Sequence, residues 1–173
     1  FYHKRIIKDI RINLMLAWLL KTSNYPKTIL LLRNPLQVAN SWLKLKWGIE
    51  HKGRKSDLDI ILSQKEILSD FPLLEKIQKL INFNDPIERL ILQWCIFYYI
   101  PLEQIPSKNI CLVKYEDVIM NPRTELSRIF NYLDMDVEIE KVLKLLQKPS
   151  NTNFLDRDLS KQHALVNQWR DEF

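Results

Sequence analysis

The chain has 173 residues, of which 46% are hydrophobic and 27% are charged, and its formal net charge at pH 7 is +5. These values exclude the disordered, collagen-like and membrane-spanning classes and are typical of a soluble globular protein. A chain of this length is expected to form one domain over residues 1–173. The small positive excess suits an anionic ligand without requiring nucleic acid.

Periodicity predicts alternating strands and helices in the first third of the chain. The apolar run at residues 5–8 predicts a short strand, and residues 12–20 have helical spacing. Residues 28–32 are continuously apolar, which predicts a central parallel strand covered on both faces. Asn34-Pro35 predicts the start of a helix that runs to about residue 46. The polar, basic stretch at residues 48–56 is expected to be a mobile loop.

In the rest of the chain, the pattern of apolar residues predicts five helical regions and one further strand. The helical regions are residues 61–81 with an interruption near Pro72, 85–100, 122–133, 139–146 and 165–169. The strand is expected at residues 110–113, with Tyr115 just beyond its C-terminal end. Together these elements predict an α/β three-layer domain with a mainly parallel sheet flanked by helices.

Phosphate-wrapping loops need glycines, and this chain has only Gly48 and Gly53. Neither lies in a G-x-x-x-x-G-K-[ST] or G-x-G-x-x-G pattern. A bound nucleotide is therefore expected to be held by other means, or by a loop outside this chain. Cys95 and Cys111 lie in apolar runs, and no Cys/His cluster has metal-ligand spacing, so no metal site is expected.

The ends of the predicted strands carry the candidate binding residues, because ligands of open α/β sheets bind beyond those ends. Arg33 places a positive charge where a strand meets a helix N-terminus, which is anion-binding geometry. Ser41 lies seven residues past Asn34, on the same helix face and roughly 10 Å along it. A phosphate on that flank would meet both side chains. In the alternative, Arg33 pairs with Glu116 or Asp117, and Ser41 bonds back to its own helix.

Two blocks of the sequence resemble the sulfotransferase family, which uses 3′-phosphoadenosine 5′-phosphosulfate (PAPS) as its donor. Residues 31–41, LLRNPLQVANS, are similar to the signature R-[DN]-P-x-x-V-x-x-S. Residues 113–122, VKYEDVIMNP, followed by IFNYL at 129–133, are similar to Y-E-D-[LV]-x-x-[DN]-P before an I-F-x-[FY]-L helix. The resemblance extends from about Ile6 to Trp169 and implies a P-loop-NTPase-like fold.

The resemblance also implies roles for single residues. Arg33 and Ser41 would hold the 3′-phosphate of the donor, and Tyr115 would lie near its adenine. Glu116 and Asp117 would fix loops, because the family transfers sulfonate without a catalytic metal.

A catalytic role is implied for Lys8, in the segment IIKDI at residues 6–10. This segment resembles the strand end at which one branch of the family carries K-T-H, and the lysine would stabilise charge on the moving sulfonate. Ile10 stands where that branch has its histidine base, so the base is expected to be Asp9 or a residue upstream of Phe1.

The family's donor loop, P-[KR]-S-G-[TS]-[TS], is expected to precede Phe1. On this interpretation the chain is a truncated domain that lacks its first strand and its 5′-phosphosulfate loop. The 173 residues alone are then expected to show no measurable sulfonate transfer.

The sequence therefore predicts a sulfotransferase that moves a sulfonate from PAPS to a hydroxyl or amine and releases adenosine 3′,5′-bisphosphate. The acceptor is left open between a carbohydrate and a small molecule. The alternative is a non-catalytic basic module that binds a nucleotide or polyanion and has lost the donor loop. No nucleic-acid partner and no membrane span are expected, and a cytoplasmic location is expected from the lack of secretory features.

Overall fold

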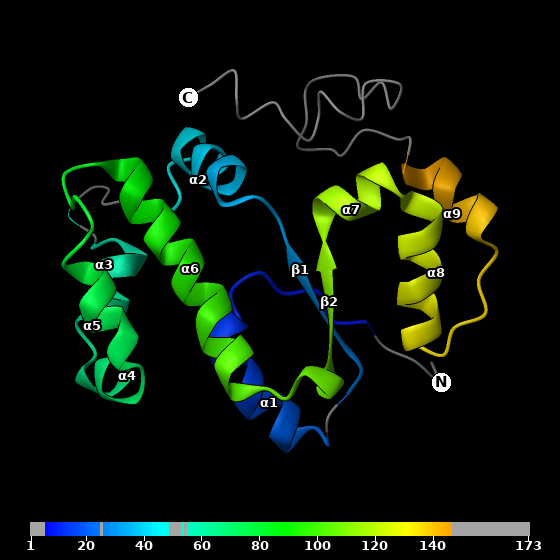
Figure 1. Cartoon of the computed structure of the whole chain (residues 1–173), viewed down its shortest axis with the longest axis horizontal. Helices are drawn as coiled ribbons and strands as arrows, with labels where there is room; N and C mark the ends of the chain where they lie inside the picture. The colour runs from blue at the N-terminus through cyan, green and yellow to red at the C-terminus, as the bar shows by residue number, and fades with distance from the viewer. Residues whose placement is uncertain (1–5, 25, 49–52, 54, 147–173) are drawn as a thin grey trace. The chain divides into compact units, whose positions relative to one another are not determined.

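The computed structural model describes residues 6–24, 26–48, 53 and 55–146. The chain divides into two compact units, whose elements are drawn in Figure 1. Unit 1 comprises Phe1–Pro26 and Gly48–Asn109, and unit 2 comprises Lys27–Trp47 and Ile110–Phe173.

Unit 2 is built on a parallel pair of strands, β1 (Thr28–Leu32) and β2 (Ile110–Lys114). The two arrows lie side by side in Figure 1, in a register that pairs the first residues of both strands and the last residues of both strands. Both strands lie where the apolar runs predict them, so the parallel α/β prediction is confirmed. The expectation that β1 is covered on both faces is wrong, because Ile29 and Leu31 remain 39% and 51% exposed.

Four helices follow the strands of unit 2. They are α2 (Pro35–Lys44), α7 (Tyr115–Met120), α8 (Pro122–Tyr132) and α9 (Ile139–Leu146). Arg128 of α8 donates to the Leu112 carbonyl at 3.0 Å and contacts the Cys111 sulfur at 3.2 Å, and the Tyr132 hydroxyl accepts from the Thr28 amide at 3.2 Å. Helix α8 is thereby fixed to both strands.

Two Asn-Pro pairs begin helices in unit 2, but only one of the asparagines caps its helix. The Asn34 side chain accepts from the amides of Leu36 and Gln37, at 2.9 and 3.4 Å. Asn121 precedes α8 without a side-chain capping bond. Both helix starts are confirmed, whereas the cap that the Asn-Pro pattern also predicts for Asn121 is not formed (φ −132°, ψ 56°).

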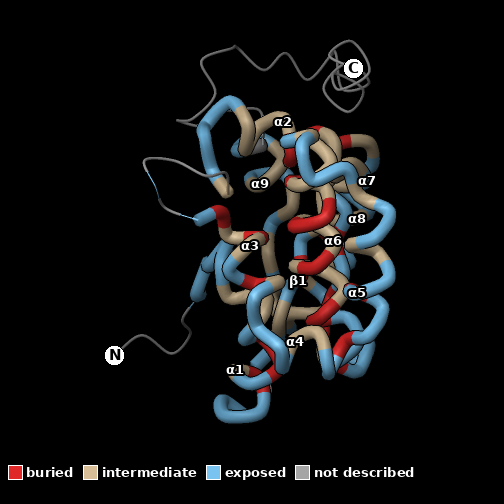
Figure 2. The backbone as a smooth tube through the Cα atoms, turned by 90° about the vertical axis from the view of Figure 1, so that its left-hand side faces the viewer, coloured by how far each residue is buried: buried red, intermediate tan, exposed pale blue. Residues whose placement is uncertain are grey.

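Unit 1 is helical in the residues described. Its elements are η1 (Asn13–Met15), α1 (Leu16–Thr22), α3 (Asp57–Leu62), α4 (Lys65–Asp70), α5 (Pro72–Gln78), α6 (Pro86–Gln104) and η2 (Ser107–Asn109). Side chains of α6 form a core with apolar residues of α3, of α5 and of the link between α4 and α5. The core residues are Leu58, Ile61, Phe71, Leu74, Leu92, Ile96 and Ile100. Figure 2 shows the buried positions repeating along α6. The break predicted near Pro72 is confirmed, and a second break separates α3 from α4.

Helix α6 continues past its predicted end at about Ile100 and contains Pro101. Proline has no amide hydrogen, so it cannot donate to the Phe97 carbonyl four residues earlier. The Asn13 side chain donates to that carbonyl instead, at 3.1 Å. This bond joins η1 to α6 and supplies the hydrogen bond that Pro101 cannot make.

The strand predicted at residues 5–8 is wrong for residues 6–8, which are irregular. Ile6 and Ile7 are 88% and 80% exposed. A strand needs a neighbour for its backbone groups, and within the described ranges β1 and β2 pair only with each other. The helix predicted at 165–169, and residues 49–52 and 54 of the predicted loop, lie outside the described residues.

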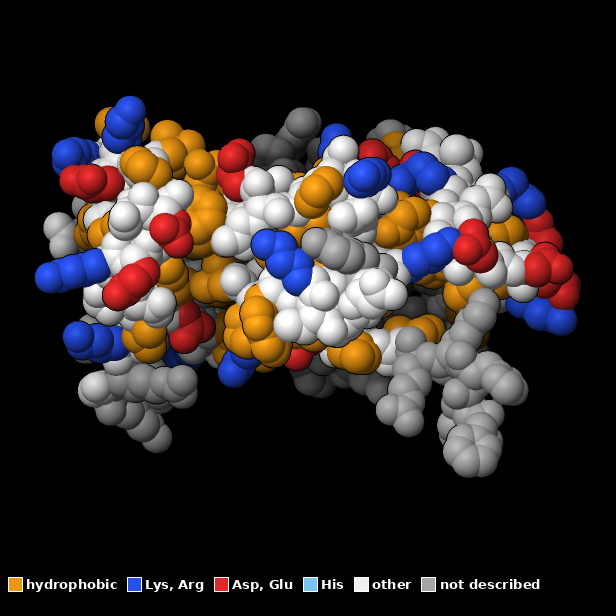
Figure 3. Space-filling view, turned by 90° about the horizontal axis from the view of Figure 1, so that it is seen from below, with side chains coloured by type: hydrophobic (Ala, Val, Ile, Leu, Met, Phe, Trp, Pro, Cys, Tyr) orange, Lys and Arg blue, Asp and Glu red, His pale blue; other side chains and the backbone are white. Residues whose placement is uncertain are grey.

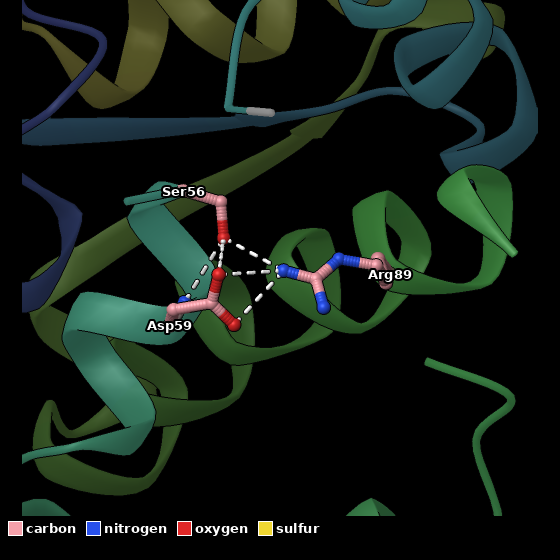
Figure 4. A network of polar contacts seen from close by, with 3 residues as sticks. All are labelled: Ser56, Asp59 and Arg89. Carbon is pink, nitrogen blue, oxygen red and sulfur yellow. Dashed lines mark hydrogen bonds and ion pairs between the residues drawn. The ribbon is translucent and has the colours of Figure 1, made fainter. Parts of the chain in front are cut away.

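A three-residue polar network ties α3 to α6 (Figure 4). Ser56 caps α3 by accepting from the Asp59 amide at 3.1 Å, and its hydroxyl donates to the Asp59 carboxylate at 2.6 Å. Arg89 of α6 donates to both Asp59 oxygens, at 2.9 and 2.8 Å, and to the Ser56 hydroxyl at 2.8 Å. Burial raises the pKa of Asp59, but the hydrogen bonds from Ser56 and Arg89 and the charge of Arg89 together outweigh it. The pKa of Asp59 therefore lies below its ordinary value of 3.8.

Replacing Arg89 with alanine is expected to lower the free energy of unfolding by about 1–2 kcal/mol, because the half-buried Asp59 carboxylate loses its charged donor. Urea titration of the parent and of Arg89→Ala measures the difference. The matched control is Lys79→Ala, which removes an exposed pair with Glu75 at 3.9 Å in the same unit. An effect of Arg89→Ala no larger than that of the control contradicts the assignment.

The same network predicts a pH dependence of stability. Because folding lowers the pKa of Asp59, its contribution is fully present above the unfolded value near 3.8 and is lost as pH falls through the folded value. The stability difference between the parent and Asp59→Asn should therefore be constant from pH 7 to about pH 5 and should shrink below about pH 4.

The two Asn-Pro helix starts supply a further prediction with an internal control. Asn34→Ala removes two capping bonds and is expected to lower the free energy of unfolding by about 1 kcal/mol. Asn121→Ala removes no capping bond and should change it by less than about 0.5 kcal/mol. Equal losses in the two variants would show that the Asn34 cap contributes nothing of its own.

Candidate functional site

The register of β1 and β2 brings two predicted site residues together. Leu32 pairs with Lys114 at the ends of the strands, so Arg33 and Tyr115 leave the sheet next to each other. The guanidinium carbon of Arg33 lies 4.8 Å from the centre of the Tyr115 ring. This is a cation–π contact, in which the electron-rich ring face attracts the positive charge.

A second contact fixes the Arg33 guanidinium from the side of α2. Its Nε donates to the Gln37 side-chain oxygen at 2.8 Å, and Gln37 is buried at 7% exposure. In the part of the chain that the structure describes, no carboxylate forms an ion pair with Arg33. The two terminal nitrogens of the guanidinium therefore carry donors that these contacts do not use.

Glu116 fixes the loop instead of neutralising Arg33. Its carboxylate accepts from the Asn34 amide at 2.8 Å, which joins the first turn of α7 to the residue that caps α2. The loop-fixing role that the family resemblance implies for Glu116 is confirmed. The alternative pairing of Arg33 with Glu116 or Asp117 does not occur among the described residues.

Ser41 lies on α2, two turns beyond Asn34, and is partly buried. Its carbonyl accepts from the Leu45 amide at 3.1 Å. Within the described ranges its hydroxyl has no hydrogen-bond partner, so the alternative in which it bonds back to its own helix is not observed. The role of Ser41 in binding a phosphate remains a prediction.

Lys8 lies in unit 1, in the irregular segment before η1, and is exposed. Next to it, the Asp9 carboxylate accepts from the Arg11 amide at 2.7 Å. Arg33 and Tyr115 belong to unit 2. The catalytic role of Lys8 remains a prediction.

Sequence reasoning missed Gln37. A signal was present, because Gln37 follows Arg33 by four residues across the start of a helix, a spacing at which side chains meet. It is also a polar residue on the buried side of an amphipathic helix.

The arrangement suits a phosphate better than a metal cation. Arg33 offers forked donors, and the N-terminal end of α2 adds partial positive charge beside it. Among the described side chains, no three His, Cys, Asp or Glu residues are grouped so that they could hold a metal ion. Within the described residues, every helix is too short or too polar to cross a bilayer.

Comparison with known proteins places the chain in a family. Neither the curated proteins nor the solved structures contain a match to it. The family described as Sulfotransferase domain, however, matches residues 3–172, which is almost the whole chain. The match includes both strands and every site residue discussed above. The chain belongs to the sulfotransferase family, and its small parallel sheet flanked by helices is part of that family's α/β fold.

Proposed function

We propose that this sulfotransferase uses PAPS as its donor and transfers the sulfonate to a hydroxyl or amine acceptor. The observation that carries the proposal is the Arg33 guanidinium held on the Tyr115 ring at the ends of β1 and β2. A nucleotide with a phosphate on its ribose fits this pair, because the pair offers a cation and an aromatic ring close to each other. Family membership supplies the type of reaction, and the pair supports the choice of donor.

In this proposal each residue of unit 2 has a distinct task. The terminal nitrogens of Arg33 donate to two oxygens of the 3′-phosphate, a geometry for which arginine is well suited. The Ser41 hydroxyl donates to the same phosphate from α2. One face of the Tyr115 ring supports Arg33, and the rest of the ring contacts the adenine.

The donor, when bound, supplies an activated sulfonate and is left as adenosine 3′,5′-bisphosphate after transfer. Lys8 stabilises the negative charge on the moving sulfonate, as positioned cations do in phosphoryl transfer. Asp9, or a residue outside this chain, takes the proton of the acceptor.

The charge distribution on one face of the molecule does not favour the alternative of a module that binds extended polyanions. On the face shown in Figure 3, acidic and basic side chains are interspersed across the described residues. A polyanion-binding surface typically gathers its cations on one face.

Arg33→Ala is expected to weaken binding of adenosine 3′,5′-bisphosphate by roughly 10- to 150-fold, the equivalent of losing about 1.5–3 kcal/mol from a charged hydrogen-bonded contact. Binding of adenosine 5′-monophosphate, which lacks the 3′-phosphate, should change by less than about 3-fold. Titration calorimetry on the protein as its gene encodes it measures both affinities.

The matched control is Arg123→Ala, which removes the same charge from an exposed pair with Glu140 in the same unit. This variant should leave both affinities unchanged, because exposed pairs contribute little. Equal losses for the two nucleotides in Arg33→Ala would refute the 3′-phosphate assignment.

Lys8→Ala is expected to lower kcat and kcat/KM together while leaving the affinity for adenosine 3′,5′-bisphosphate unchanged, because Lys8 acts on charge that develops during transfer. Steady-state kinetics of the protein as its gene encodes it, combined with calorimetry, separates the two effects. Arg11→Ala is the matched control for an exposed cation of the same segment. An unchanged kcat with a raised donor KM would make Lys8 a binding residue instead.

A further inference from the structure

We infer that Gln37 is a positioning residue that orients the Arg33 guanidinium for phosphate binding. This inference rests on the proposed function, because it deepens the role given to Arg33. Gln37 acts through Arg33 and does not touch the nucleotide itself.

The burial of Gln37 shows that its position is fixed. Its side chain is almost wholly buried in the first turn of α2, and its backbone amide donates to the Asn34 cap at 3.4 Å. A buried amide group is costly unless it is hydrogen-bonded, and its oxygen accepts from Arg33 Nε at 2.8 Å.

The two contacts of Arg33 restrict different motions. The Tyr115 ring holds the guanidinium at 4.8 Å from its centre but leaves it free to turn over the ring face. A hydrogen bond at Nε removes that rotation, because Nε lies on one edge of the planar group. When both contacts are made, the terminal N–H groups of Arg33 point in one fixed direction. The side chain of Arg33 therefore loses less rotational freedom when a phosphate binds.

The chemistry of the amide also suits this task. Gln37 accepts a hydrogen bond without carrying a negative charge, so it orients Arg33 without neutralising it. Glu116, one of the two acidic partners considered for Arg33, accepts a hydrogen bond from the Asn34 amide. The positive charge of Arg33 is thereby kept for an anionic ligand.

The test is a double-mutant cycle between Gln37→Met and Arg33→Lys. Methionine keeps the length and volume of glutamine but removes the oxygen acceptor. Lysine keeps the charge of arginine but has no Nε–H to donate. Calorimetry on the protein as its gene encodes it gives the ratio of the affinities for adenosine 3′,5′-bisphosphate and for adenosine 5′-monophosphate.

With Arg33 present, Gln37→Met is expected to lower this ratio roughly 3- to 10-fold, the effect of one hydrogen bond. In the Arg33→Lys background, the Gln37 substitution should leave the ratio unchanged, because the donor that it serves is gone. Gln104→Met, an exposed glutamine-to-methionine change in unit 1, is the matched control and should leave the ratio at the parent value. Gln37→Ala removes the same acceptor and replaces Gln37→Met if that variant does not fold.

A purely structural role of Gln37 would lower both affinities equally and leave the ratio unchanged, which overturns the inference. Equal effects in the Arg33 and Arg33→Lys backgrounds would show that Gln37 acts independently of Arg33, which also overturns it. Failure of the proposed function would give a different result. In that case Arg33→Ala would also leave the ratio of the two nucleotide affinities unchanged.

Discussion

The register of β1 against β2 pairs Leu32 with Lys114, and the contacts at the strand ends follow from that pairing. Both strands run in the same direction, so Arg33 and Tyr115 leave the sheet at one edge. A slip of one residue would move Tyr115 by about 3.3 Å and turn its side chain to the other face. Helix α8 opposes such a slip, because it is bonded to the backbone of both strands.

The polar groups around Arg33 are arranged so that its charge stays available. The Glu116 carboxylate accepts a hydrogen bond from the Asn34 amide, and the Asn34 side chain in turn caps α2. Gln37 binds Nε as a neutral acceptor, and Tyr115 supports one face of the guanidinium. In the proposed function, stability and binding are therefore served by different groups, because the Glu116 carboxylate fixes the backbone beside Arg33 and does not neutralise it.

Sequence reasoning located the strands at 28–32 and 110–113 because continuous apolar runs carry that information locally, and it located α2 because Asn34-Pro35 is a strong start signal. It failed at residues 6–8, where an apolar run has no strand partner in the described ranges. It also missed the hydrogen bond between Arg33 and Gln37, because that contact depends on which side-chain conformation Arg33 adopts. Local sequence patterns predict helices and strands, whereas the partners of a strand or a side chain depend on tertiary packing.

The central claim is that Arg33, held between Tyr115 and Gln37, binds a phosphate of the sulfonate donor. A crystal structure of the protein with adenosine 3′,5′-bisphosphate tests it most directly. The account predicts the terminal nitrogens of Arg33 within about 2.7–3.2 Å of two oxygens of the 3′-phosphate, with the contacts to Tyr115 and Gln37 preserved. A 3′-phosphate bound away from Arg33, or one reached only after Arg33 leaves the Tyr115 ring, would contradict it.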